Sequence, residues 1–308
     1  MDIERINPEL RDTYRRLPQL PFHNRPFLWL ARLGMRVMQP RDQLADVTVE
    51  TRQVATGTAR VYRPRDRCGA ALLWIHGGGM ICGLPAQNHL ECLQYAGQLG
   101  LVVAAIPYRL APEHPCPAAI DDCHSGWHWL QGLAGELGFD PARVVVAGQS
   151  AGGGLAAALA QRLADEGGVQ PAAQSLHCPM LDDRTAARTE LDPVKHKMWN
   201  NRSNRAGWSW YLGHAVGEAN TRPYAVPARR EDLAGLPPAW IGIGDADLFL
   251  EESAVYRGRL RAAGVSCDWH QAPGGFHGFE GVAPNAAITR AFWDDNYRFL
   301  RQILSLPQ

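Results

Sequence analysis

Ser150 has the surroundings that a nucleophilic serine needs. It lies at the centre of Gly148-Gln149-Ser150-Ala151-Gly152, after the apolar run RVVVA and before the Ala/Leu-rich segment GGLAAALAQRL. A sharp turn between a strand and a helix exposes a serine hydroxyl, and the positions two before and two after it need glycine because a side chain there would clash. The pattern predicts such a turn with Ser150 as the nucleophile. The alternative interpretation is a tight turn with a helix-capping serine.

Serine attack on a carbonyl also requires donors that stabilise the resulting oxyanion. The segment LLWIHGGGM places Gly78 and Gly79 directly after another predicted strand, where their backbone amides can face a carbonyl oxygen held beside Ser150. The amide of Ala151, at the start of the following helix, can face the same oxygen. Glycine-rich loops also bind phosphate, but neither GxxxxGK[ST] nor GxGxxG occurs in the sequence.

The candidate base and acid occur late in the chain. His277 lies in PGGFHGFE, a glycine-flanked loop from which a side chain can reach a site at the carboxyl ends of parallel strands. His270 lies in the predicted strand VSCDWHQ, where we expect a structural role. Asp245 and Asp247 both follow the predicted strand AWIGIG, and both are candidates for the acid that orients the histidine. The chain order is serine, acid, histidine.

The elements that must position these residues alternate in type along the chain. From about Ala70 onward, apolar runs such as ALLWI, LVVAAI and RVVVAG alternate with Ala/Leu-rich segments of helical period. This alternation predicts an α/β fold with a mostly parallel, doubly wound sheet and helices on both faces. Before it, DVTVETRQVATGTARVYRP predicts an antiparallel hairpin at the sheet edge, with its turn near Gly57.

Two segments depart from this alternation and are expected to form a lid. The first runs from Met1 to about Gln39 and has helical patterns interrupted by prolines, and the second is a polar, Trp-rich stretch from Leu181 to Gly213. The tryptophans of the second segment have two interpretations, walls of an apolar acyl pocket or core residues. They are Trp199, Trp208 and Trp210.

Six motifs, in the expected order between about Ala70 and Leu300, resemble the bacterial hormone-sensitive lipase family of carboxylesterases, within the α/β-hydrolase fold. They are HGGGM, YRLAPEHPCPAAIDDC, GQSAGGG, PMLDDRT, GDADLFLEE and FHGFE. In that family the acid is the first residue of D-x-x-x-[DE]-E, which falls on Asp247 and leaves Asp245 to shape the turn. The resemblance likewise places the base on His277.

The resemblance also implies the oxyanion amides and the domain organisation. The amides fall on Gly78, Gly79 and Ala151. The implied α/β-hydrolase catalytic domain comprises residues 46–182 and 221–308, and the implied cap comprises N-terminal helices in 1–45 and an insertion in 183–220.

The implied activity is hydrolysis of short-chain acyl esters through a Ser-His-Asp triad, with no cofactor and no metal. The family usually has Asp or Glu where this chain has Gln149, so we expect a difference in charge near Ser150. Arg109, Glu113 and His114 are expected to brace the glycine loop. The implied quaternary structure is a homodimer through the edge strand VSCDWHQ.

Composition excludes several classes of partner. Lys plus Arg equals Asp plus Glu at 31 each, so no basic excess suggests a nucleic-acid partner. No apolar run approaches the roughly 18 residues of a membrane span, although the basic amphipathic segment RPFLWLARLGMRVM has a membrane-surface alternative. The seven cysteines show no paired-ligand spacing and the N-terminus shows no secretory signal. These features predict a cytoplasmic protein with reduced thiols.

One histidine pair has a metal-binding spacing. His124 and His128 are one helical turn apart, which suits zinc, but the sequence offers no evident third ligand. The same segment carries a core stripe, so we expect no metal there. The stripe consists of Ile120, Cys123, Trp127 and Leu130.

Two alternative functions remain open at this point. An amidase or formamidase would use the same triad, and turnover of matched esters and amides distinguishes it. A ligand-binding protein would keep the hydrolase shell without turnover, as the gibberellin receptors of this fold do, but those lack the catalytic histidine that His277 would supply.

Overall fold

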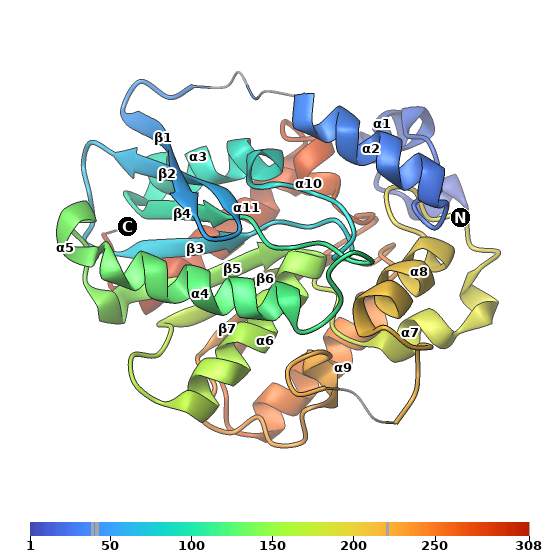
Figure 1. Ribbon diagram of the computed structural model, residues 1–308. Coiled ribbons are helices and arrows are strands. Elements are labelled where there is room, and N and C mark those ends of the chain that lie inside the picture. The colour runs from blue at the N-terminus through green and yellow to red at the C-terminus, as the bar shows by residue number, and fades with distance from the viewer. Residues whose placement is uncertain (38–39, 41–42, 220–221, 308) are drawn as a thin grey trace.

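The computed structural model describes residues 1–37, 40, 43–219 and 222–307, and its centre is one eight-stranded sheet (Figure 1). The strand order is β1-β2-β4-β3-β5-β6-β7-β8. The first pair is antiparallel, β2 is antiparallel to β4, and the remaining neighbours are parallel. The strands are β1 (Val47–Val54), β2 (Gly57–Pro64), β3 (Ala71–Ile75), β4 (Val102–Ile106), β5 (Val144–Gln149), β6 (Ala173–His177), β7 (Ala239–Gly244) and β8 (Cys267–Ala272).

The predicted hairpin and the doubly wound sheet are confirmed. Strands β1 and β2 pair from Val47 opposite Pro64 to Val54 opposite Gly57, where Gly57 takes a positive φ of 139° at the turn. Strands β3, β4 and β7 are buried along their length, which is why they are apolar throughout rather than alternating.

Helices cover both faces of the sheet, and the side chains of β3 show the division. Ala71, Leu73 and Ile75 pack in the cluster that includes α4, α6 and α9, while Leu72 and Trp74 pack in the cluster that includes α3 and α11. In Figure 1, α4 and α6 lie side by side over one face. The bounds are α3 (His89–Leu99), α4 (Ala118–Gly132), α6 (Ala151–Glu166), α9 (Leu250–Ala262) and α11 (Ala287–Ile303).

The N-terminal segment and the insertion after β6 lie together at one end of the molecule (Figure 1). Tyr14 donates from its hydroxyl to the Lys195 carbonyl at 3.1 Å, and the rings of Phe22 and Trp199 lie 5.6 Å apart. These contacts join the two segments that the sequence assigns to a lid. Their helices are α1 (Arg11–Arg16), α2 (Arg25–Val37), α7 (Asp183–Ala187) and α8 (Asn201–Leu212).

The division into a catalytic domain and a cap stays a prediction, and its boundary at 220/221 lies outside the described residues. The remaining short helices are α5 (Ala134–Leu137), α10 (Phe279–Val282) and the 3₁₀ helices Ile3–Arg5, Pro8–Leu10, Pro85–Asn88, Pro141–Arg143, Thr189–Leu191 and Pro227–Arg229. Among the described residues, no helix combines the length and the hydropathy that crossing a membrane requires.

Candidate active site

Ser150 occupies the turn between β5 and α6 in a backbone conformation that is rare for a residue with a side chain. Its φ is 57° and its ψ is −119°. The Ser150 amide donates to the His177 carbonyl at 2.8 Å, and the Ser150 carbonyl accepts from the Met180 amide at 2.9 Å. These bonds to the end of β6 and the segment after it hold the strained turn in place.

The glycines beside Ser150 are required by close backbone contacts. A Cβ on Gly148 would lie 2.4 Å from the Gly152 carbonyl oxygen, and a Cβ on Gly152 would lie 2.0 Å from the Ile75 carbonyl oxygen. Real Cβ atoms do not approach oxygen this closely, so the expected steric reason for small neighbours is confirmed. The turn is packed against the end of β3.

His277 lies between a serine and a carboxylate. Its Nε2 is 2.9 Å from the Ser150 Oγ, and its Nδ1 is 2.8 Å from the Asp247 Oδ2. His277 comes from the loop between β8 and α10, and Asp247 from the turn after β7, so the carboxyl ends of three parallel strands bring the group together. All three residues are buried.

The charges around His277 favour its protonated form. Burial opposes the charge on the imidazolium, but the charge and hydrogen bond of the adjacent Asp247 carboxylate, together with the charge of Glu280, outweigh burial and raise the pKa of His277. The other oxygen of Asp247, Oδ1, accepts from the Phe249 amide at 2.9 Å, which fixes the carboxylate. The geometry therefore orients the imidazole and supports a positive charge on it.

The two candidate acids, Asp245 and Asp247, make different contacts in the structure. Asp245 accepts from the Gly274 amide at 2.7 Å through Oδ1 and so ties the turn after β7 to the loop after β8. Asp247 alone of the two contacts His277. His270, on β8, faces Phe292 of α11 and lies 3.6 Å from Asp295, which agrees with its expected structural role.

The glycine loop after β3 also depends on the absence of side chains. Gly78 and Gly79 have φ values of 114° and 62°, and a Cβ on Gly78 would lie 2.1 Å from the Cys82 carbonyl oxygen. Within the described part of the chain, no residue accepts a hydrogen bond from the amides of Gly78, Gly79 or Ala151. These N–H groups are available to a ligand.

Aromatic and charged side chains lie around that loop. His76 stacks on Tyr108 with ring centroids 4.2 Å apart, and burial lowers the pKa of His76 to about 4, so the ring is neutral near pH 7. Arg109 forms a bidentate pair with the buried Asp122 of α4, with a closest distance of 2.7 Å. Glu113 pairs at 2.9 Å with Arg32 of α2, which links the brace to the N-terminal segment.

A buried polar network beside the site was missed by the sequence reasoning. Gln149 donates from Nε2 to Glu280 Oε1 at 2.6 Å and accepts from Asn88 Nδ2 at 3.0 Å. Burial raises the pKa of Glu280, while the hydrogen bond from Gln149 acts in the opposite direction. An acidic residue in place of Gln149 would bring two carboxyl groups together here. Glu280 is the last residue of the motif FHGFE, and this motif was the only feature of the sequence that could have pointed to Glu280.

A pocket of about 620 Å³ opens onto Ser150 and His277. Leu20, Phe22 and Met35 of the N-terminal segment line it together with Trp199. The other two tryptophans of the insertion do not line it, since Trp208 is buried and Trp210 packs under Arg25. Trp199 is therefore a wall of the pocket, and Trp208 is a core residue.

The site is poorly suited to a metal ion. Donor atoms of Cys178, Asp247 and His277 lie within 4.8 Å of one another. Both ring nitrogens of His277 already contact Ser150 and Asp247, and burial raises the pKa of the Cys178 thiol well above its ordinary value. A protonated thiol is a weak metal ligand.

Known proteins resemble the whole chain. A family model described as the alpha/beta hydrolase fold matches residues 72–281. The esterase LipI of Mycobacterium tuberculosis is 32% identical over 285 residues, which cover 91% of this chain and 82% of LipI. The ethyl acetate hydrolase of Pseudomonas putida is 33% identical over 254 residues, covering 77% and 76% of the two chains.

Solved structures of bacterial esterases are also similar to this chain. The structure titled bacterial heroin esterase superposes with a TM-score of 0.86 at 32% identity and covers 99% of this chain and 97% of that chain. The chain therefore belongs to the alpha/beta hydrolase family. Within it, the chain groups with bacterial esterases related to hormone-sensitive lipase, as the sequence motifs predict.

Proposed function

We propose that this protein is a carboxylesterase in which Ser150, His277 and Asp247 form the catalytic triad. The observation that carries the proposal is the pair of contacts made by His277, 2.9 Å to the Ser150 Oγ and 2.8 Å to the Asp247 carboxylate. A neutral imidazole held in this way accepts the serine proton, and the carboxylate stabilises the imidazolium that forms. The esterase names of the relatives support the same reaction class.

Ser150 attacks the ester carbonyl carbon while its proton passes to Nε2 of His277. The carbonyl oxygen becomes an oxyanion, and the amides of Gly78, Gly79 and Ala151 donate to it. Collapse of the tetrahedral intermediate breaks the bond to the alcohol oxygen, which takes the proton from His277 and leaves as the alcohol. Water, deprotonated by His277, then attacks the acyl-enzyme in the same way and releases the carboxylic acid.

The pocket supports short acyl chains as the preferred substrates. Phe22 and Trp199 lie against each other in its wall, with ring centroids 5.6 Å apart. One of the relatives is named an ethyl acetate hydrolase, which is a short-chain activity. We therefore expect acetyl to hexanoyl esters to react fastest, as the resemblance implies.

The test is hydrolysis of a p-nitrophenyl ester series from acetate to palmitate by the native protein and by Ser150→Ala. Removing the nucleophile should lower kcat on the order of 10⁴-fold or more at every chain length. The control is Ser125→Ala, an exposed serine of α4 that should leave turnover unchanged. Equal turnover by Ser150→Ala would refute the assignment.

The same assay separates the alternative functions. Faster turnover of a matched amide than of its ester would identify an amidase. No turnover of either substrate, together with binding of the ester, would identify a ligand-binding member of the fold.

The proposal extends to location and partners. All seven cysteines are unpaired, and every one except Cys68 is buried, which supports a reducing, cytoplasmic location. The expected partner is the acyl ester, with no nucleic acid and no stable membrane insertion. Strand β8 is a sheet edge, which supports a homodimer through that strand. Sedimentation at twice the chain mass of 33.9 kDa would agree with the dimer.

A further inference from the structure

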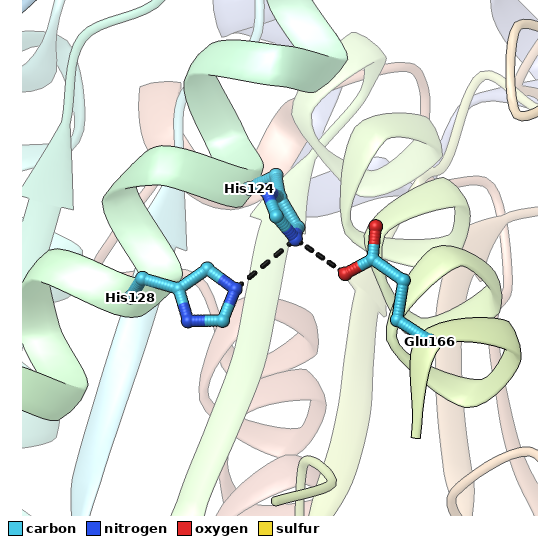
Figure 2. Close-up of side chains that lie close together, drawn as sticks. All are labelled: His124, His128 and Glu166. Carbon is cyan, nitrogen blue, oxygen red and sulfur yellow. Dashed lines mark hydrogen bonds and ion pairs between the residues drawn. The ribbon is translucent and has the colours of Figure 1, made fainter. Parts of the chain in front are cut away.

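A second cluster of reactive side chains lies on the helices that cover one face of the sheet. His124 and His128 are on α4, and Glu166 is the last residue of α6 (Figure 2). Nε2 of His124 lies 2.6 Å from Oε2 of Glu166 and 3.1 Å from Nε2 of His128. We propose that these three residues form a binding site for a divalent transition-metal ion such as Zn²⁺.

The histidines are not part of the α4 core stripe. The stripe residues Cys123 and Trp127 are buried as expected, whereas His124 is partly exposed and His128 is exposed. Because His124 and His128 are one turn apart, both rings project from the same side of α4, toward the end of α6 (Figure 2). Glu166 therefore supplies the third ligand that the sequence did not reveal.

A single proton on Nε2 of His124 cannot make a full hydrogen bond to both of its neighbours, Glu166 and His128. A ring nitrogen carries either a proton or a lone pair. If Nε2 of His124 donates its proton to Glu166, it has no lone pair to offer His128. If it keeps the lone pair, it faces the Glu166 carboxylate as a second acceptor. A cation bound by all three groups removes this conflict, because each then contributes a lone pair.

The distances suit a zinc ion. The three donor atoms lie within 4.8 Å of one another. Zn–N and Zn–O bonds of about 2.0–2.1 Å in a tetrahedral site place ligand atoms roughly 3.3 Å apart, so small side-chain shifts suffice. The partly exposed position leaves the fourth coordination position to water.

Neighbouring charges hold the carboxylate in place. Arg162 contacts the other oxygen of Glu166, Oε1, at 2.8 Å and also pairs with Asp121 at 2.7 Å. This leaves Oε2 for the histidines and the ion. The carboxylates of Glu166 and Asp121 and the guanidinium of Arg162 give a net charge of −1 beside the two histidines, which favours a cation.

The ion would join α4 to α6 far from the proposed nucleophile. Ser150 precedes the first residue of the 16-residue α6, and Glu166 ends it, so the two lie about 24 Å apart along the helix. The site therefore acts on the packing of these helices and not on ester chemistry. The inference does not depend on the proposed function.

The test is a titration of Zn²⁺ into the EDTA-dialysed full chain near neutral pH, followed by calorimetry and thermal unfolding. One equivalent should bind and raise Tm. His124→Ala and His128→Ala should each weaken binding at least on the order of tenfold and abolish the Tm shift. His214→Ala is the control, because it removes another partly exposed histidine near a glutamate, Glu218, and should bind Zn²⁺ like the native protein.

Two further readouts make the result decisive. Co²⁺ should give visible absorption without a thiolate charge-transfer band, and Ser150→Ala should bind both ions like the native protein. No binding, equal affinity in the native protein and both histidine variants, or a thiolate band would each overturn the proposal. Failure of the esterase assay leaves this result unaffected.

Discussion

At the scale of single residues, the proposed mechanism depends on the contacts of His277. Its imidazole must be neutral to accept the serine proton, yet the Asp247 carboxylate raises its pKa. In the proposed mechanism, a raised pKa makes His277 a stronger base and makes activity sensitive to mild acid.

The pH dependence of kcat/KM follows from this pKa. As pH falls through the raised pKa of His277, the base becomes protonated, so kcat/KM should fall with a midpoint above about 6.5. Asp247→Asn removes the charge that contributes most to raising the pKa of His277, and burial, which lowers the pKa, then outweighs the remaining charge of Glu280. The midpoint of the residual activity should therefore move to lower pH, and kcat should drop on the order of 10⁴-fold.

The measurement is a set of pH–rate profiles for both proteins with a p-nitrophenyl ester. Asp245→Asn is the matched control, since Asp245 binds the Gly274 amide and does not contact His277. A midpoint that stays in place in Asp247→Asn would show that another carboxylate sets the pKa.

At the scale of elements, the turn between β5 and α6 depends on close approach to β3. Gly152→Ala would place a methyl group 2.0 Å from the Ile75 carbonyl oxygen. The backbone must shift, so we expect a loss of about 3 kcal/mol in the free energy of unfolding, measured with urea.

Gly258→Ala is the control for that substitution. Gly258 lies on the exposed side of α9 with no atom near the position of a new Cβ. Alanine there should stabilise the protein by about 0.5–1 kcal/mol because of its higher helix propensity. Equal effects of the two substitutions would contradict the packing account of the turn.

The sequence predicted those elements whose role follows from local pattern. The apolar runs predicted β3, β4, β5 and β7, and the small residues around Ser150 predicted the turn. Strand β6 was not among the expected strands, because its buried residues include Gln174, Ser175 and His177. Each of them makes a hydrogen bond to a residue distant in the sequence, as when Gln174 donates to the Pro237 carbonyl at 3.0 Å.

Contacts between distant segments limited the prediction of the site. The spacing of motifs placed Ser150 and His277, but Asp247 was chosen over Asp245 only through the family resemblance. Glu280 is 131 residues from Gln149, and Glu166 is on a different helix from His124. No periodicity or local motif encodes such pairs, because they arise only when the sheet brings its covering helices and loops together.

At the scale of the whole molecule, the N-terminal segment and the insertion after β6 meet at the pocket, which they line with Phe22 and Trp199. Trp199→Leu should enlarge the acyl pocket and raise the ratio of kcat/KM for octanoate over butyrate on the order of tenfold. Both kcat/KM values in the ratio are measured on the same variant. A partial loss of folded protein therefore lowers both values equally and leaves the ratio unchanged.

The control for this substitution is Trp210→Leu. Trp210 belongs to the same lid helix, α8, but does not line the pocket. Its ratio should match that of the native protein. An unchanged ratio in Trp199→Leu would place the acyl chain elsewhere.

The central claim is that Ser150 is the nucleophile activated by His277. The most direct measurement is reaction with a fluorophosphonate followed by peptide mass spectrometry of the full chain. The account predicts one adduct, on Ser150, formed in parallel with loss of ester hydrolysis and greatly slowed in His277→Ala. An adduct on another residue that abolishes hydrolysis, or hydrolysis that survives complete labelling of Ser150, would contradict it.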